Sequence, residues 1–326
     1  MARTRLYREG RLEAEDFPLD DISEHLREPA AVVWLDLTDP EKGDWDRVQE
    51  EFGLHALAIE DASSPHERPK LVHYAKHLFF NAYQTDFHAE AGEAEVHEVS
   101  AFVTKQALIT AHGSDFDMDA VVERWDATAD DLAGSGVAFL AHGLLDVVVD
   151  KQFDAVQALD DELEALEDRL FDETAKSIRE VQQRSFKLRK TLGRMRKVIT
   201  PMRELVNGLM HGRGHEHVVD DDLVPYYHDL YDHVLRVAEF TESLRDFVAT
   251  ILDSNLAVQG NRQNTVMKKV TSWAAIIAVP TAVTGYYGQN IPFPGYEKPL
   301  GLLTSSILIV VLSVGLYFTF KRRDWL

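Results

Sequence analysis

The sequence contains no cysteine. Disulfide bridges and metal sites built on thiolates are therefore excluded for this chain. The opening segment, MARTRLYREGRLEAEDF, also lacks a run of apolar residues. We therefore expect no secretory signal there, and any membrane insertion has to be directed by segments elsewhere in the sequence.

Basic side chains are in short supply. The 326 residues include 34 Lys and Arg against 55 Asp and Glu, which gives a formal net charge of -21 at pH 7. Nucleic acid is a poor partner for such a chain, because phosphate binding requires a basic face. The excess of carboxylates suits a protein that handles cations, and it is equally typical of an ordinary soluble surface.

Ionisable side chains other than tyrosine are absent from two stretches, residues 270–288 and 301–320. Each stretch is about long enough to cross a hydrocarbon layer of roughly 30 Å at 1.5 Å per helical residue. The second is the more apolar of the two. The first carries Thr271, Ser272 and Thr281, which suits a helix that faces a packed or wet interior rather than lipid.

The flanking charges predict an orientation. Lys268 and Lys269 precede the first span, and the Lys-Arg-Arg at 321–323 follows the second. Because cytoplasmic flanks are enriched in Lys and Arg, both ends are placed in the cytoplasm. The sequence thus predicts a multi-pass protein of the plasma (cytoplasmic) membrane, with cytoplasmic N- and C-termini and a short outer loop at 289–300.

The part before the spans mixes two periodicities. β-Branched and aromatic runs predict strands at 31–37, 77–87 and 100–112, and helical spacing appears at 44–54 and 115–128. We therefore expect a compact α/β domain.

Long helical patterns follow this domain. An acidic stretch at 160–173 and a basic stretch at 186–198 predict a helical hairpin whose charges pair. Pro225 suits a helix start, and no further proline occurs before Pro280. One helix of roughly sixty residues, about 90 Å long, is therefore expected to run into the first span.

Six segments in this order resemble the CorA family of divalent-cation channels. The segment at 59–80, IEDASSPHERPKLVHYAKHLFF, resembles the family's His-x-Arg-Pro-Lys segment. The segments LLDVVVDKQFDAVQALDDELEALE and VPYYHDLYDHVLRVAEFTESLRD resemble the starts of its helical hairpin and its pore helix. NTVMKKVT, YYGQN and the terminal KRRDWL complete the order.

The resemblance implies a homopentamer in the lipid bilayer that passes hydrated Mg²⁺, and with it Co²⁺, into the cytoplasm. Five copies of the first span would line one axial pore, and the second span would face lipid. The implied architecture is a cytoplasmic α/β domain (1–136), a cytoplasmic helical hairpin (137–224), a long pore helix (225–290) that includes the first transmembrane span (270–288), an outer loop (289–300), a second transmembrane span (301–320) and a basic cytoplasmic tail (321–326), together forming a pentameric funnel.

The selectivity filter falls on Gly288, Gln289 and Asn290, where the family usually has Gly-Met-Asn. Mg²⁺ sheds water reluctantly, so the pore is expected to admit the ion with its first water shell. Five Asn290 side chains would offer carbonyl oxygens to that shell, and Gly288 would permit a close backbone approach. Zinc-transporting relatives also vary the middle position, so Gln289 leaves the preferred metal open among Mg²⁺, Co²⁺ and Zn²⁺.

The resemblance also implies a pore face and regulatory metal sites. Met267 and Val270 would form an apolar constriction, although ordinary helix packing explains such residues equally well on sequence alone. The implied pore-lining residues are Asn264, Met267, Val270, Ala278, Thr281 and Gly285. A regulatory Mg²⁺ between subunits would be held by Asp61 and Asp229, with Glu60 and Asp146 near a second ion; without the resemblance, these acids read as surface charges or helix caps.

Beside the channel, two other functions stay open, and an enzyme is disfavoured. A Zn²⁺ transporter, with or without proton coupling, fits the variant signature, but neither span contains an acid or histidine for an intramembrane proton relay. A non-conducting membrane-anchored sensor or scaffold is disfavoured by the polar positions of the first span. An enzyme is not expected, because no nucleophile–base motif or phosphate-binding loop occurs. His211, His215 and His217 are interpreted as a solvated turn.

Overall fold

The structure is a computed structural model that describes residues 2–64, 68–132, 135–171, 175–211, 219, 221–289, 292, 295–296 and 298–326. The chain divides into two compact units, Met1–Ile251 and Leu252–Leu326. Each unit is described by itself.

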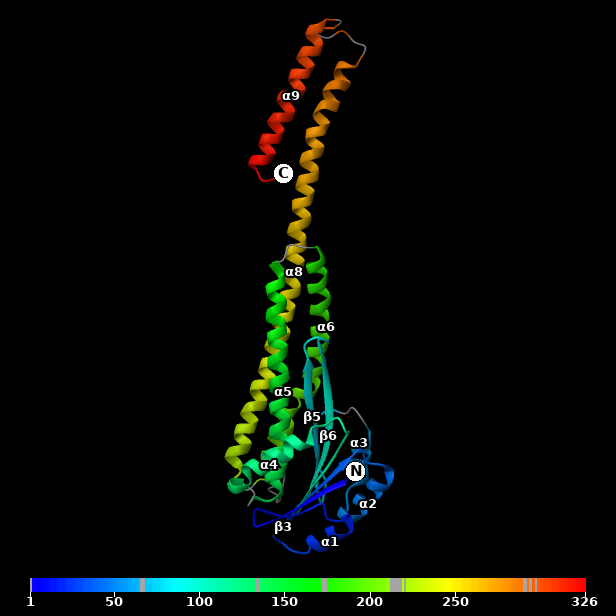
Figure 1. The fold of residues 1–326 in the computed structure, drawn as a ribbon, viewed down its shortest axis with the longest axis vertical. Coiled ribbons are helices and arrows are strands. Elements are labelled where there is room, and N and C mark those ends of the chain that lie inside the picture. The colour runs from blue at the N-terminus through cyan, green and yellow to red at the C-terminus, as the bar shows by residue number, and fades with distance from the viewer. Residues whose placement is uncertain are drawn as a thin grey trace. The chain divides into compact units, whose positions relative to one another are not determined.

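A seven-stranded sheet organises the first unit (Figure 1). Its order is β2-β1-β3-β7-β6-β5-β4. Only one of its neighbouring pairs, β3 with β7, is parallel. The strands are β1 (Ala2–Arg8), β2 (Arg11–Glu15), β3 (Ala31–Thr38), β4 (Lys70–His73), β5 (Leu78–His88), β6 (Glu93–Val103) and β7 (Ala107–His112).

Alternation along β3 shows how the sheet is covered on both faces. Val33 and Leu35 enter a core with residues of α1 (Ile22–His25), α2 (Lys42–Phe52) and α3 (Ala56–Ser63). Trp34 points to the other face, where its ring meets Trp125 of α4 (Met118–Leu132) edge-on, with centroids 4.9 Å apart. A strand that is buried on both faces is apolar almost throughout, which explains the run AVVWLDL.

The long helices of the first unit follow the sheet. α5 (Val137–Asp168) packs on β5, where the Gln152 side-chain amide donates to the Tyr83 carbonyl at 2.8 Å. The remaining elements are the short 3-10 helices η1 (Leu19–Asp21) and η3 (Arg169–Phe171), then α6 (Ala175–Ile199), α7 (Met202–Met210) and the first part of α8 (Val224–Tyr287).

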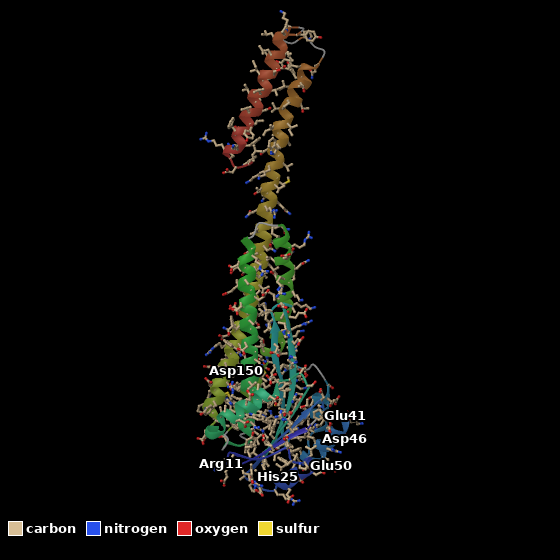
Figure 2. All side chains as sticks on the ribbon, in the orientation of Figure 1. Arg11, His25, Glu41, Asp46, Glu50 and Asp150 are labelled. Atoms are coloured by element: carbon tan, nitrogen blue, oxygen red, sulfur yellow. The ribbon has the colours of Figure 1, made fainter. Side chains whose placement is uncertain are left out.

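Local signals account for the helix ends. Glu41, which Figure 2 labels, forms a capping box with Asp44 at the start of α2, where each side chain accepts from the other residue's backbone N–H. The same helix ends at Gly53, which takes a left-handed conformation with φ of 63°. α9 (Pro299–Arg322) has proline in its first turn, where the missing N–H costs nothing.

Two strand predictions need correction. The run at 100–112 is two strands, β6 and β7, because Thr104 reverses the chain: its backbone N–H and its hydroxyl both donate to the Ala107 carbonyl, at 2.9 and 3.1 Å. The hairpin of β1 and β2 was not predicted. Its turn residues Glu9 and Gly10 both have positive φ, 49° and 77°, as tight hairpins of this twist require.

Only some of the ion pairs of α6 are those expected within the helical hairpin; others join α6 to different elements. Arg184 of α6 pairs with Glu162 of α5 at 2.8 Å. Lys187, in the basic stretch, instead pairs with Glu93 of β6 at 2.9 Å, and Arg196 pairs with Glu242 of α8. The basic stretch therefore ties α6 to the sheet and to α8, whereas the pair with α5 comes from Arg184, just before that stretch.

The second unit consists of the rest of α8 and all of α9. Both helices are long and apolar enough to cross a membrane. α8 is a single helix of 64 residues that continues through Pro280. At the end of α9 the backbone N–H of Trp325 donates to the Phe320 carbonyl at 3.0 Å, and the two rings stack.

Candidate functional site: a free helix face and a carboxylate cluster

The membrane-spanning part of α8 has two different faces. Ser272 is fully buried, and the partly covered positions 275, 276, 279, 280, 283 and 287 continue the same face. α9 has a matching row of covered positions at 301, 305, 309, 313, 316 and 320. Because each row recurs every three or four residues, each is one face of its helix, and we infer that the two rows face one another within this unit.

The residues predicted to line a pore lie on the other face of α8. With 3.6 residues per turn, Ala278, Thr281 and Gly285 point roughly opposite to Ser272 and its row. All three are exposed in the single chain. Met267 and Val270, closer to the first unit in sequence, are 63% and 59% exposed. Asn264 is exposed near the edge of this face. We call these six residues the free face of α8.

Hydroxyl groups on α8 are satisfied without a partner helix. Thr281 donates to the Ile277 carbonyl at 3.2 Å, and Thr284 donates to the Pro280 carbonyl at 2.8 Å. Each hydroxyl thus has a backbone acceptor within its own helix, which favours its burial in apolar surroundings. The Thr281 oxygen still has lone pairs that can accept a hydrogen bond from water.

The end of α8 explains one of the predicted filter residues. A Cβ atom on Gly288 would lie 3.0 Å from the Thr284 carbonyl oxygen, so the close helix end favours glycine there. The Gly288 N–H donates to that oxygen at 2.8 Å, and the Gln289 N–H donates to the Tyr286 carbonyl at 3.3 Å. Asn290 lies outside the described residues.

A stretch between the two ends of α8 has no cover at all. Residues 261–271 are helical, and all of them are exposed. An isolated helix of this length is marginal in water. In the single chain, therefore, the residues that the structure describes give this segment little cover.

The predicted regulatory acids lie at separate places in the chain. Asp61 and Glu60 are on α3, where Asp61 accepts from Lys70 of β4 at 2.9 Å. Asp229 is near the start of α8, and its side chain is 74% exposed. The expected site joins Asp61 to Asp229 of a second subunit, so the single chain leaves it a prediction.

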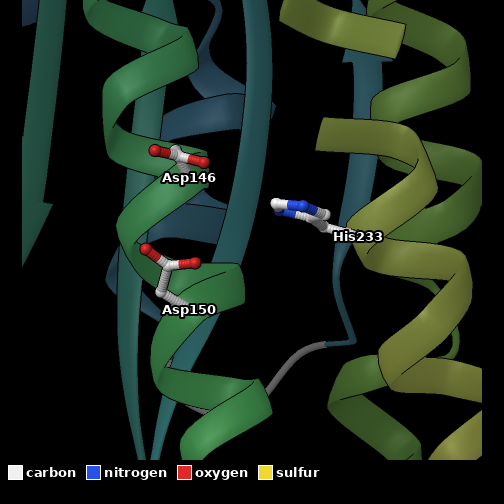
Figure 3. Close-up of side chains that lie close together, drawn as sticks. All are labelled: Asp146, Asp150 and His233. Carbon is white, nitrogen blue, oxygen red and sulfur yellow. The ribbon is translucent and has the colours of Figure 1, made fainter. Parts of the chain in front are cut away.

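Asp146 is brought together with two residues that the sequence reading did not select. Asp146 and Asp150 are one turn apart on α5, and His233 on α8 points at them across the gap (Figure 3). One ligand atom from each of the three lies within 4.8 Å of the others. Two carboxylates and an imidazole could hold a divalent metal ion, and the imidazole suits Zn²⁺ or Co²⁺ better than Mg²⁺.

An arginine competes for this cluster of Asp146, Asp150 and His233. Arg124 of α4 contacts Asp146, and its other terminal nitrogen lies 2.6 Å from Asp150. Burial raises the pKa of Asp146, and the Arg124 guanidinium offsets part of that rise. The single guanidinium offsets one of the two carboxylate charges and contacts an oxygen of each, so a cation has to compete with Arg124 for these ligands.

The signal for this cluster was present but weak. Asp146 and Asp150 have the i, i+4 spacing of neighbours on one helix face, and His233 follows Asp229 by the same interval. Sequence spacing does not show that His233 of α8 lies beside Asp146 and Asp150 of α5, because these residues are far apart in the sequence. Of the three loop histidines, His211 is exposed and bonds to the Asn207 carbonyl at 3.1 Å; His215 and His217 lie outside the described residues.

The arrangement defines a class of protein: a membrane protein with a large α/β domain followed by two helices that are long and apolar enough to span a membrane. The chain belongs to the family described as the CorA-like Mg2+ transporter protein, whose model matches residues 29–322. The resemblance noted from the motifs is thereby confirmed. Because that family consists of ion transporters, the chain is a transport protein and not an enzyme.

Individual relatives cover nearly the whole chain. The cobalt/magnesium transport protein CorA of Thermotoga maritima is 30% identical over 319 residues, which is 96% of this chain and 90% of the relative. The zinc transport protein ZntB of Yersinia enterocolitica is 21% identical over 297 residues, 90% of this chain and 86% of its own.

A solved structure confirms the fold. The complete CorA magnesium transporter of Methanocaldococcus jannaschii aligns with 100% of this chain and 99% of its own, with a TM-score of 0.81 and 21% identity. The predicted α/β domain, long helical hairpin, long helix and two C-terminal apolar helices are therefore confirmed as a fold.

Proposed function

We propose that five copies of this chain form a channel that passes hydrated Mg²⁺, and also Co²⁺, into the cytoplasm. The observation that carries the proposal is the free face of α8, which the chain's own second span leaves uncovered. A small and polar face on a membrane helix needs either a partner helix or water. Five copies of this face around one axis would pack against one another and would also line a water-filled pore. The related cobalt/magnesium transport protein supports the choice of ions.

The proposed pore acts on the water shell of the ion. Full dehydration of Mg²⁺ is costly, whereas its bound waters present hydrogen-bond donors outward. Thr281 and Asn264 offer oxygen acceptors to those donors, and Asn290 does so at the outer mouth. Neutral acceptors hold the ion weakly, which conduction requires.

Met267 and Val270 are proposed to close the pore. Both are apolar, exposed in the single chain and one helical turn apart on the free face. A ring of such side chains excludes water when the helices approach one another, and a hydrated ion cannot cross a dry constriction. Opening then requires only a small separation of the α8 helices.

Cytoplasmic Mg²⁺ is proposed to favour the closed state through Asp61 of one subunit and Asp229 of the next. Two facing carboxylates about 4 Å apart repel by roughly 4 kcal/mol at an effective dielectric of 20. A bridging divalent ion removes this repulsion and draws the subunits together. Asp61 already binds Lys70 at 2.9 Å, so Mg²⁺ has to compete with that ammonium group. Glu60 and Asp146 are proposed to lie near a second regulatory ion.

The decisive experiment for regulation is flux into liposomes as a function of internal Mg²⁺. Asp61→Ala and Asp229→Ala should each move the midpoint of inhibition to higher Mg²⁺, because each removes a ligand of the bridging ion. Asp222→Ala, another exposed acid just before α8, is the matched control and should leave the midpoint unchanged. An unmoved midpoint in both site variants would show that these acids are surface charges only.

Zn²⁺ transport is a second candidate, favoured by Gln289 in the signature and by the related zinc transport protein. Uptake into liposomes should be compared for Mg²⁺, Co²⁺ and Zn²⁺, each with and without a pH gradient. Faster Mg²⁺ flux without dependence on the gradient supports the leading proposal. Zn²⁺ flux that needs the gradient supports the alternative.

The orientation is also a proposal. Lys268 and Lys269 before the first span and Lys321, Arg322 and Arg323 after the second favour cytoplasmic termini in the plasma membrane. The uncharged spans between them leave the short outer loop as the ion's point of entry.

A further inference from the structure

A strongly basic cavity lies between α6 and α8 in the first unit. Its volume is about 730 Å³, within the range of sites that hold small molecules. The wall residues come from α6, from α8 and from the segment before β4. Leu192 and Thr241, each only 2% exposed, form its floor. The cationic side chains that line it are Arg68, Arg189, Arg196, Lys197 and Arg245.

This concentration of positive charge is contrary to the rest of the chain. The whole protein has a formal charge of -21, yet Asp246 is the one carboxylate among the described residues that line the cavity. Gathering like charges costs free energy unless counter-charges approach them. The composition therefore does not explain the cavity, and an anionic occupant would.

Some of the positive charge is compensated internally. Glu242 pairs with Arg196 and, at 3.1 Å, with Arg245. Arg189, Lys197 and Arg68 differ: among residues that the structure describes, none of them has a carboxylate within 4.0 Å. The cavity thus keeps free cations on two of its walls.

We propose that this cavity binds an oligophosphate, either inorganic or the phosphate chain of a nucleotide. Guanidinium groups bind phosphate oxygens through paired N–H donors, and an ammonium adds a mobile point charge. Cations on separate walls suit several linked phosphates better than one. The described lining residues include no aromatic ring, so the cavity has nothing on which a nucleotide base could stack. The proposed recognition therefore depends on the phosphate groups of the ligand.

The proposal also has a consequence for the helices. Arg189 and Lys197 belong to α6, whereas Arg245 belongs to α8. An anion held by both helices would tie them more firmly than the pair of Arg196 with Glu242 does alone. α8 is the helix that continues to Tyr287, so bound oligophosphate would stiffen the base of that helix. This inference stands independently of which cation is transported.

The test is titration calorimetry on the full-length protein in detergent, with chelator present so that no divalent ion bridges. The probes are triphosphate, pyrophosphate, orthophosphate and ATP, all as sodium salts. Triphosphate should bind at least tenfold more tightly than orthophosphate, and ATP should match triphosphate. Raising the salt concentration should weaken all binding, because the contacts are ionic.

Matched variants locate the binding. Arg189→Ala with Lys197→Ala should weaken triphosphate binding at least tenfold. Lys190→Ala with Arg194→Ala removes two equally exposed cations from α6 that do not line the cavity, and should change binding less than twofold. All four side chains are exposed, so both double variants should keep the helical signal in circular dichroism.

Two outcomes would overturn the proposal. One is equal triphosphate binding by the two double variants, which would place the anion elsewhere. The other is absence of triphosphate binding together with a changed oligomeric state of the Arg189, Lys197 variant. In that case the cavity holds an acidic segment from a second copy of the chain. Tight ATP binding with weak triphosphate binding would likewise contradict recognition through phosphates.

Discussion

The two units of this chain use the same kinds of apolar residues in opposite ways. In Met1–Ile251, Trp34 and Phe79 are fully buried by the chain's own helices and sheet. In Leu252–Leu326, Ile277 is 63% exposed and Leu302 is 75% exposed. The first unit carries its own core. The second leaves its apolar side chains uncovered within the chain, as is expected of helices that lie in lipid.

This difference in burial predicts what a substitution in each unit will affect. Substitutions in the first unit should act mainly on stability, because buried atoms lose their contacts there. Substitutions of Met267 and Val270 on the free face of α8 should act mainly on transport, because both side chains are largely exposed in the single chain.

The largest effect is expected from Asn290→Ala in the second unit. Loss of the outer ring of amide oxygens should abolish Mg²⁺ flux into liposomes and leave the oligomer intact by size-exclusion chromatography. Leu300→Ala, in the first turn of α9 and exposed, is the control and should conduct. Wild-type flux through an intact Asn290→Ala oligomer would remove the filter from this position.

Truncating one phenylalanine in each unit tests this difference in burial directly. Phe79→Ala, at a fully buried position, should lower the free energy of unfolding by about 3–5 kcal/mol. Phe318→Ala, at a position 62% exposed, should change it by less than about 0.5 kcal/mol. Urea unfolding in detergent, followed by tryptophan fluorescence, measures both. Equal losses would mean that α9 also depends on contacts within the chain.

Arg124→Ala should convert the carboxylate cluster into a metal site. Without its guanidinium, Asp146 and Asp150 become free to bind a cation with His233. We expect Zn²⁺ and Co²⁺ to bind at least tenfold more tightly by calorimetry, a gain of about 1.4 kcal/mol. The double variant Arg124→Ala with His233→Ala should lose that gain, and its persistence would place the added metal at another site.

The smallest effect is a pH dependence inside the first unit. His112 on β7 faces an acceptor at each ring nitrogen: the Asp36 carboxylate at 3.1 Å and the Gly113 carbonyl at 2.7 Å. Burial lowers the pKa of His112, but the bonds to Asp36 and Gly113 outweigh it and the net shift is upward. Only the protonated ring can donate to both acceptors.

The sign of this dependence follows from the raised pKa. The protonated ring stabilises the fold fully below the unfolded value of about 6.5, and that contribution is lost as pH rises through the folded pKa. The unfolding free energy should therefore fall as the pH rises above about 6.5, and more steeply in wild type than in His112→Gln. His211→Gln, at an exposed position, should follow wild type. Parallel curves for wild type and His112→Gln would contradict the assignment.

The sequence was sufficient where the signal is local and long. The uncharged spans and the absence of proline between Pro225 and Pro280 predict α8 and α9, because helix length and hydropathy need no knowledge of partners. It was insufficient where the signal is short, as at Glu9 and Gly10, whose turn and flanking strands were not predicted.

Contacts between distant segments were the other limit. Nothing near Asp146 in sequence announces His233, and nothing near Arg189 announces Arg245, because each pair meets only after α5 or α6 has packed beside α8. The acidic and basic runs of the hairpin were recognised, but their partners were assigned too narrowly. Lys187 and Arg196 reach β6 and α8 because side chains pair with the nearest carboxylate in space.

The uncovered stretch at 261–271 has a consequence for how the protein is made. A lone subunit presents the exposed side chains of Lys268 and Lys269 on this helix, and proteases cut where a backbone can open locally. Unassembled chains should therefore be cleaved within this stretch, near the start of the second unit, whereas assembled chains should resist. The presence of intact chain in the cell would then indicate assembly. The segment that is most open to proteolysis in the single chain would also allow unassembled subunits to be degraded.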